Sequence, residues 1–413
     1  MNARSEAGLV GAALALAFAA CSSSSNAPAS DTVSVFGGDD LFDVPIKGLS
    51  APDVVAFNDG DGLFDLPLRP YDGLGPLYTR SSCGDCHSKG TRGPGLVQKM
   101  VVVQADGITP AVDQSSLPYG HTVHPLVAGG ATTPVTVPVG MADVKVTIRV
   151  GPPILGRGYL EAIDDAEIER VATEQAARAD AIHGRVNRLT YASQPNPDPT
   201  FNAHQPGDQV IGRFGLKARI ATIDEFTADA LQGDMGITSP LRPAEIPNPD
   251  GLTDDLKPGV DVSIESVNKR ATYVRTTAIP KRADAEAHGA QLFSDAKCAV
   301  CHVPALKTRA DYPIALLAGI DAPVYTDVLL HDLGDALADG MVEGLATGRD
   351  WRTAPLIGLR FNRTFMHDGR AHDIDGAIAA HGSPGSEANE SVALYRGMSA
   401  ADQGALLAFV ESR

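Results

Sequence analysis

Two short segments of the chain share one pattern, in which two cysteines stand three positions apart and a histidine follows the second. Residues 83–87 read CGDCH and residues 298–302 read CAVCH. Cys-x-x-Cys-His is the attachment signature of c-type haem. On one helical turn, cysteines at this spacing share a face and can form thioethers with two haem vinyl groups, while the histidine is placed to coordinate the iron. The sequence therefore predicts two covalently bound haem c groups, held by Cys83, Cys86 and His87 and by Cys298, Cys301 and His302.

Three other uses of these four cysteines fit the pattern less well. A four-cysteine zinc site would have to join two pairs that stand far apart in the sequence, and both histidines would then have no role. A thioredoxin-like pair needs a strand followed by a helix, which the segment DAKCAVCHVPAL does not suggest. Disulfides between cysteines three positions apart are uncommon. Haem attachment is the interpretation that uses every residue of both motifs.

Charge and length limit the classes of partner. The 413 residues suffice for two or three domains, and 34 basic against 51 acidic residues give a net charge of −17. This acidity argues against nucleic acid or an anionic membrane surface as a partner.

The N-terminus has the features of an export signal. An apolar run, Leu9–Ala20, follows Arg4 and is too short to span a bilayer, which needs roughly 20 residues. It ends at Cys21, as in bacterial lipoprotein signals. We predict a signal peptide over residues 1–20, lipidation of Cys21 and a disordered tether over residues 21–39, with a plain secretory signal as the alternative. The expected location is periplasmic or cell-surface, lipid-anchored to a bacterial membrane.

The rest of the chain predicts a fold that is mainly α with inserted β hairpins. β-Branched runs between residues 100 and 150 indicate strands, residues 160–184 have helical spacing, and a terminal helix is expected after an N-cap at Ser399. The helix before the second motif, with Gly289 and Phe293, resembles the cytochrome c helix that crosses the C-terminal helix. We predict an N-terminal haem domain with a β insertion over residues 40–268 and a C-terminal cytochrome c-like domain over residues 269–413.

Several further segments, among them GRFGLKA, GDMGITSP and FMHDGRAHDIDGAIAAH, occur together with the two motifs. In this combination the chain, from about residue 40 to 410, resembles the di-haem oxidoreductase family, peroxidase-like proteins also labelled thiol oxidoreductases. That family is in turn similar to bacterial di-haem cytochrome c peroxidases. The resemblance implies two cytochrome c-like haem domains, one with a reactive haem and the other with a haem that relays electrons.

The second haem needs a ligand on the face opposite His302. Ile374, Ala377, Ile378 and His381 lie on one apolar face of a predicted helix. In the di-haem peroxidases, the sixth ligand of the electron-transferring haem follows fourteen residues after the histidine of an HDG-like turn, and here that position is His381. The resemblance therefore implies His302 and His381 as axial ligands, with Met366 as a rival. Two histidines give a lower potential than histidine with methionine.

The first haem, on His87, is less well defined by sequence. His121 and His124 are its candidate distal ligands. The resemblance implies Glu161 as the catalytic group that moves protons during peroxide cleavage, and an ordinary exposed helix glutamate is the alternative. The related peroxidases also bind calcium between their domains, but no carboxylate cluster in this sequence supports such a site.

We therefore expect an exported di-haem c-type oxidoreductase that reduces hydrogen peroxide or a similar oxidant at one haem. A small cytochrome or cupredoxin would supply electrons through the second haem. A non-catalytic di-haem electron-transfer cytochrome, or a di-haem oxygenase or protein-modifying oxidase, remains open, because one fold hosts different chemistries.

Overall fold

The computed structural model describes residues 35–36, 43–253, 257–282 and 287–413. The predicted signal peptide, Cys21 and most of the predicted tether lie outside these residues. Two residues of that tether do not: strand β1 (Val35–Phe36) pairs in parallel with β8 (Ile279–Pro280). Within the described residues, no helix has both the length and the apolar character that crossing a membrane requires.

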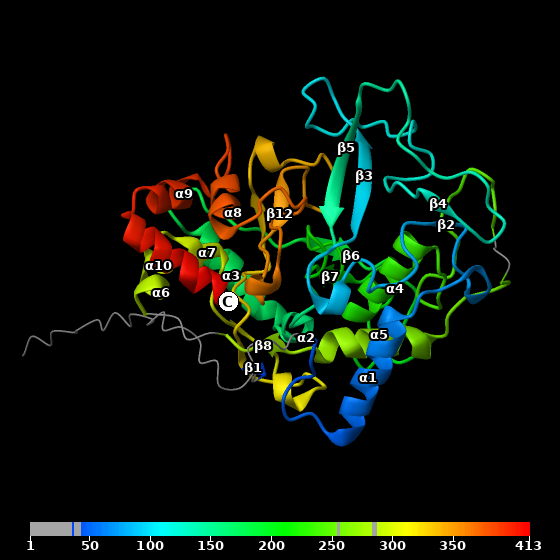
Figure 1. Ribbon diagram of the computed structural model, residues 1–413, viewed down its shortest axis with the longest axis horizontal. Helices are drawn as coiled ribbons and strands as arrows, with labels where there is room; N and C mark the ends of the chain where they lie inside the picture. Colours follow the sequence, from blue (N-terminus) through cyan, green and yellow to red (C-terminus); the bar gives the residue numbers. More distant parts are fainter. Residues whose placement is uncertain (1–34, 37–42, 254–256, 283–286) are drawn as a thin grey trace, which may run out of the picture.

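Four helices of the first two thirds of the chain pack together on one side of the molecule (Figure 1). They are α1 (Ala51–Asp65), α2 (Arg157–Ala162), α4 (Ile223–Met235) and α5 (Ile264–Thr276), whereas α3 (Asp165–Ala176) lies on the side of the C-terminal helices. Helix α1 begins after Ser50, whose hydroxyl accepts the N–H of Asp53, and it packs along α5. The ring of Tyr273 on α5 contacts those of Phe57 and Phe64 on α1, with centroids 5.1 and 5.0 Å away.

A long hairpin projects from this part of the molecule (Figure 1). It pairs β3 (Leu96–Val102) with β5 (Val144–Val150), so the prediction of strands between residues 100 and 150 is confirmed here. The remaining strands form short antiparallel pairs: β2 (Leu77–Tyr78) with β4 (Leu126–Val127), β6 (Arg188–Thr190) with β7 (Gln209–Ile211), β9 (Leu306–Lys307) with β10 (Asp321–Ala322), and β11 (Leu330–Asp332) with β12 (Asp350–Arg352).

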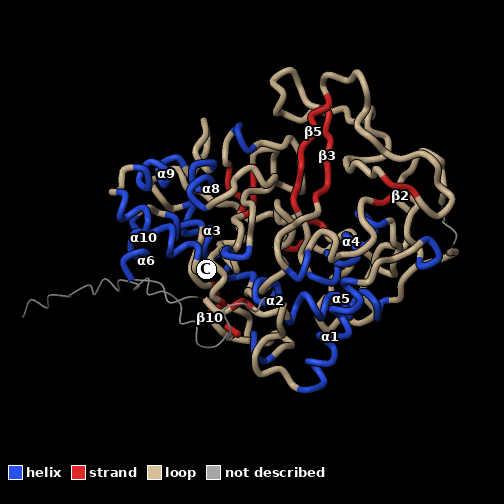
Figure 2. The backbone as a smooth tube through the Cα atoms, viewed as in Figure 1, coloured by secondary structure: helices blue, strands red, loops and turns tan. Residues whose placement is uncertain are grey.

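Two details differ from the sequence predictions. Loops make up most of the described chain (Figure 2), so a mainly α fold with inserted hairpins is confirmed only in part. The helix predicted over residues 160–184 is two helices, because the chain leaves helical geometry at Ile163 and Asp164 then caps α3 by accepting the N–H of Ala166. Helix α3 ends at Ala176.

The C-terminal part holds α6 (Ala287–Asp295), α7 (Cys298–Cys301), α8 (Ile374–Ala380), α9 (Asn389–Arg396) and α10 (Ala400–Glu411). The hydroxyl of Ser399 accepts the N–H of Asp402, so the predicted N-cap of the last helix is confirmed. The predicted crossing is also present. Gly289 on α6 lies against the backbone of α10, and the rings of Phe293 and Phe409 are 5.3 Å apart.

The predicted domain boundary between residues 268 and 269 falls inside α5, which packs against α1, α2 and α4. One large apolar cluster also joins residues from both sides of that boundary, for example Leu160 and Ile223 with Leu306 and Val324. The division into two haem domains stays a prediction.

The α6–α10 crossing generates a stability prediction. A Cβ at Gly289 would lie 2.5 Å from the carbonyl oxygen of Ala405, whereas a Cβ at Gly404 on α10 would meet nothing within 4 Å. Gly289→Ala should lower the free energy of unfolding of the holoprotein by about 1–3 kcal/mol, as expected for overpacking. Gly404→Ala should raise it by about 0.5–1 kcal/mol. Denaturant titration measures both, and equal effects would show that the helices do not cross this closely.

Candidate cofactor sites

The first motif follows α1 as a tight turn. The N–H of Cys83 donates to the carbonyl of Phe64, and the N–H of His87 donates to the carbonyl of Cys83 at 3.0 Å. The base of the β3–β5 hairpin closes on this turn, since a Cβ at Gly151 would lie 2.5 Å from the carbonyl oxygen of Cys86. The absence of a side chain at Gly151 therefore lets the hairpin approach the histidine that follows Cys86.

His87 is held by a distant carbonyl. Its Nδ1 lies 2.6 Å from the carbonyl oxygen of Pro152, so Nδ1 is the protonated nitrogen. The other ring nitrogen, Nε2, then has a free electron pair for a metal. Burial lowers the pKa of His87 to about 4, so the imidazole is neutral, as a metal ligand must be.

The second motif repeats this arrangement. Cys298 to Cys301 form the single turn of α7, and the N–H of His302 donates to the carbonyl of Cys298 at 2.9 Å. The Nδ1 of His302 lies 3.2 Å from the carbonyl oxygen of Tyr325, and the Phe293 ring packs 6.4 Å away. Burial, followed by the influence of His381, lowers the pKa of His302 to about 4.

His381 closes α8 at its C-cap and lines the same cavity as His302. Asp373 starts that helix by accepting the N–H of Gly376. The Nδ1 of His381 lies 2.7 Å from the carbonyl oxygen of Ala377, so Nε2 is again the free nitrogen, and burial lowers the pKa of this ring. His302 and His381, both neutral and with Nε2 free, therefore line the second cavity together with His331 and His367. That His302 and His381 bind a haem as axial ligands stays a prediction.

The residues of each motif line a separate cavity. A cavity of about 90 Å³ is lined by Cys83, Cys86 and His87, and a cavity of about 270 Å³ by Cys298, Cys301, His302 and His381. All four cysteines are free thiols. Pro152, Pro153, Arg157 and Arg352 line both cavities, so the two sites share a wall.

Buried arginines provide a test of whether these cavities suit haem. Arg92, Arg157 and Arg352 line them, and none forms an ion pair with a described carboxylate. Burial lowers the pKa of Arg92 and Arg352 to about 10 and that of Arg157 to about 9. The Nε of Arg92 and the Nη1 of Arg157 are buried without a hydrogen-bond acceptor. A buried guanidinium needs an anion, and the two carboxylates of a haem are suitable anions. The residues present therefore fit the cofactor.

The sequence matches a known family. The model for "Di-haem oxidoreductase, putative peroxidase" matches residues 130–413, about two thirds of the chain. The chain belongs to this family of di-haem oxidoreductases. The matched residues include the second motif and His381, whereas the first motif precedes them.

None of the curated proteins matches this di-haem oxidoreductase. Two solved structures are similar over most of their length. Hydrazine synthase of Kuenenia stuttgartiensis has 11% sequence identity and a TM-score of 0.34, covering 93% of this chain and 98% of the other. A variant of the diheme peroxidase BthA from Burkholderia thailandensis has 14% identity and a TM-score of 0.37, covering 93% and 92%. Because both scores are low, the family match alone identifies the chain.

Glu161, predicted as the catalytic group of the di-haem oxidoreductase, lies in a buried network and lines neither cavity. Its carboxylate accepts from the Ile223 N–H, the Arg275 guanidinium and the Tyr312 hydroxyl at 2.6–2.7 Å. Although burial alone raises the pKa of Glu161, Arg275 holds it below its usual value. Glu161 therefore has no place in either cavity, and its catalytic role stays a prediction. Glu161 joins α2, α4 and α5, and its oxygens are already occupied.

Asp234 is the carboxylate that does line the first cavity. It belongs to one face of α4, which contributes Ile223, Phe226, Thr227, Ala230 and Asp234 to that wall. Burial raises the pKa of Asp234, and no described residue forms a hydrogen bond or ion pair with its carboxylate. The helical spacing of these residues was visible in the sequence, but nothing in it shows which face of α4 meets the cavity.

His121 and His124, the candidate distal ligands, do not line the first cavity. The His121 Nδ1 lies 3.0 Å from the Met100 carbonyl, and the His124 Nε2 lies 2.7 Å from the Gly233 carbonyl. Met366, the rival ligand of the second haem, does line the second cavity.

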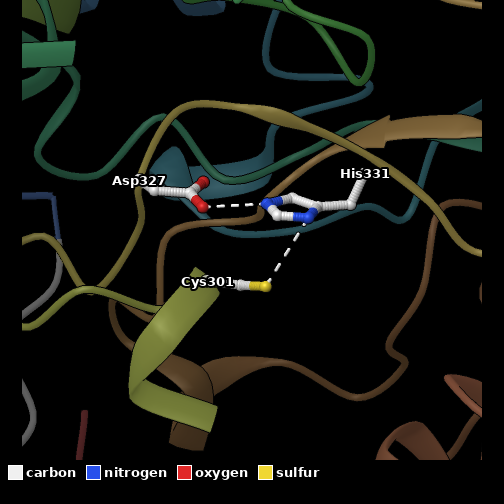
Figure 3. Close-up of side chains that lie close together, drawn as sticks. All are labelled: Cys301, Asp327 and His331. Carbon is white, nitrogen blue, oxygen red and sulfur yellow. Dashed lines mark hydrogen bonds and ion pairs between the residues drawn. The ribbon is translucent and has the colours of Figure 1, made fainter. Parts of the chain in front are cut away.

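A polar cluster supports the second motif (Figure 3). His331 lies with Nδ1 3.7 Å from the Cys301 sulfur and Nε2 2.8 Å from an oxygen of Asp327, and Glu387 is 2.7 Å from Nδ1. Cys301, Asp327 and His331 are close enough together to bind a metal ion. The sulfur, however, belongs to the Cys-x-x-Cys-His motif, so the cluster is best understood as part of the second haem site.

His381 can be tested by its effect on redox potential. His381→Met should raise the midpoint potential of one haem and leave the other unchanged, since methionine ligation raises the potential relative to histidine. A redox titration followed by absorbance measures both potentials. His372→Met, which changes an exposed residue in the same segment, is the matched control and should shift neither. Unchanged potentials in His381→Met would exclude His381 as a ligand.

Proposed function

We propose that this di-haem oxidoreductase is an exported c-type enzyme that reduces hydrogen peroxide to water. The reaction takes up two electrons and two protons per peroxide and releases two molecules of water. Two reduced molecules of a small cytochrome or cupredoxin would supply the electrons. Haem, when bound, supplies an iron that accepts electrons one at a time and a coordination face for the oxidant.

The difference between the two cavities carries this proposal. The second cavity has a histidine on α8 in addition to its motif histidine, so both faces of its cofactor would be closed. Among the residues that line the first cavity, His87 is the only histidine. A closed site favours electron relay and an open face favours reaction with a small oxidant, so the two sites suit different tasks.

The residues of the first site have separable roles. Cys83 and Cys86 would hold the cofactor covalently, and the Pro152 carbonyl orients His87 through Nδ1. Asp234 would move the proton that peroxide cleavage requires, because it is the unpaired carboxyl group in this cavity and burial shifts its pKa toward neutral pH. The apolar residues of α4 would exclude bulk water.

At the second site, Cys298, Cys301, His302 and His381 would bind a haem that relays electrons to the first. The two sites share Pro152, Pro153, Arg157 and Arg352, which supports a short path between them. The donor protein and a lipid anchor at Cys21 are part of the proposal on sequence grounds alone.

One observation favours a second candidate function. Met235 also lines the first cavity, within an apolar cluster that includes Leu231 and Leu241. If its thioether closes the distal face, both haems are six-coordinate and the protein is an electron-transfer cytochrome.

Peroxide turnover tests the enzyme proposal. The holoprotein with a reduced small c-type cytochrome should oxidise that donor in proportion to the peroxide added. Asp234→Asn should lower kcat by about 10²- to 10⁴-fold, as expected for the loss of a general acid–base group, and should remove one limb of the pH profile. The contrasting variant is Glu161→Gln, which should cost about 3 kcal/mol of stability by disrupting a buried ion pair but leave kcat of the folded protein near wild type.

Two results would contradict the proposal. No peroxide-dependent oxidation of the donor, with no change in the haem absorbance, would favour the electron-transfer cytochrome. Loss of kcat in Glu161→Gln but not in Asp234→Asn would return the catalytic role to Glu161.

A further inference from the structure

The wall between the two cavities contains two buried arginines. Arg157 begins α2 and Arg352 ends β12, so they come from distant parts of the chain. Both line the first cavity as well as the second, and each side chain is at most 9% exposed. No other charged residue lines both cavities in the described part of the chain.

These arginines lack the carboxylate partners that two other buried arginines have within the described residues. Arg149 pairs with Asp339 and Glu343, and Arg275 pairs with Glu161 and Asp224. Within the described residues, the guanidinium of Arg157 donates to the backbone carbonyl of Pro153, and its Nη1 has no acceptor. Arg352 donates to the backbone carbonyls of Gly215 and Thr353.

The two guanidinium groups are also close enough to repel each other. The neighbouring charge of Arg352 adds to burial in lowering the pKa of Arg157. Two like charges buried in one wall are costly without an anion on at least one side. Backbone carbonyls orient the two guanidinium groups but do not neutralise them, and Asp327 is the carboxylate whose charge acts on Arg352 without forming an ion pair. Each guanidinium can therefore still bind a carboxylate.

We propose that Arg157 and Arg352 form one carboxylate-binding wall that holds a propionate of each haem, so that both haems are linked electrostatically through the same pair of residues. This inference rests on the proposed occupation of both cavities by haem. Guanidinium groups bind carboxylates through two parallel N–H···O bonds, which suits a fixed orientation. Such a wall would hold one carboxylate of each haem at the same pair of residues.

The consequence is that one substitution changes both redox potentials. A positive charge beside a haem stabilises its reduced form, in which the iron carries one positive charge fewer. Loss of the Arg157 charge should therefore lower both midpoint potentials. Arg92 lines the second cavity only, so loss of its charge should lower one potential.

The experiment compares Arg157→Gln, Arg352→Gln and Arg92→Gln holoproteins by redox titration followed by absorbance, with no peroxide present. We expect both potentials to fall in the first two variants and one potential to fall in Arg92→Gln. Arg157→Lys, which retains the charge, should restore most of the shift. If Arg157→Gln does not mature, Arg352→Gln makes the same test.

The outcomes separate this inference from the proposed function. A protein that carries no haem by the pyridine haemochrome assay would overturn both. Two haems whose potentials shift singly, or not at all, in Arg157→Gln and Arg352→Gln would overturn the shared wall alone. Loss of peroxide turnover with paired potential shifts would leave the shared wall intact.

Discussion

The hydrogen bond from each motif histidine to a distant backbone carbonyl is the constraint on which both sites depend. His87 reaches Pro152 and His302 reaches Tyr325, so each Cys-x-x-Cys-His turn is tied to a different segment of the chain. The bond fixes the ring orientation and leaves Nε2 free on a residue that lines a cavity. Without it, the spacing of the motif would bring a histidine near the iron but would not orient it.

Around this shared arrangement the two sites differ in ways that follow from packing. Helix α8 delivers a second histidine to the larger cavity, whereas α4 presents apolar residues and the unpaired Asp234 to the smaller one. One site can therefore close both faces of its cofactor, and the other combines a single histidine with a group that exchanges protons. The division into relay and reactive site arises from which helix covers each cavity.

Sequence reasoning located the features that depend on local spacing, whereas haem attachment and axial ligation stay predictions. The two motifs, the α6–α10 crossing at Gly289 and the position of His381 in the second cavity all rest on short-range spacing. Sequence reasoning could not place Glu161 beside Arg275, because whether a carboxylate faces a cavity or an arginine is decided by helices distant in sequence. The pair Arg157 and Arg352 could not be predicted for the same reason, because the two residues lie far apart in the sequence. Arg213 and Lys217, the basic residues of the GRFGLKA segment, pair with Asp165 and Asp339 instead.

The central claim is that the chain binds two haems with unequal coordination. Electron paramagnetic resonance of the fully oxidised holoprotein, with the haem content fixed by the pyridine haemochrome assay, tests it most directly. The account predicts two haems per chain, one low-spin with two histidine ligands and one high-spin with a single histidine. Two low-spin haems, or one haem per chain, would contradict it.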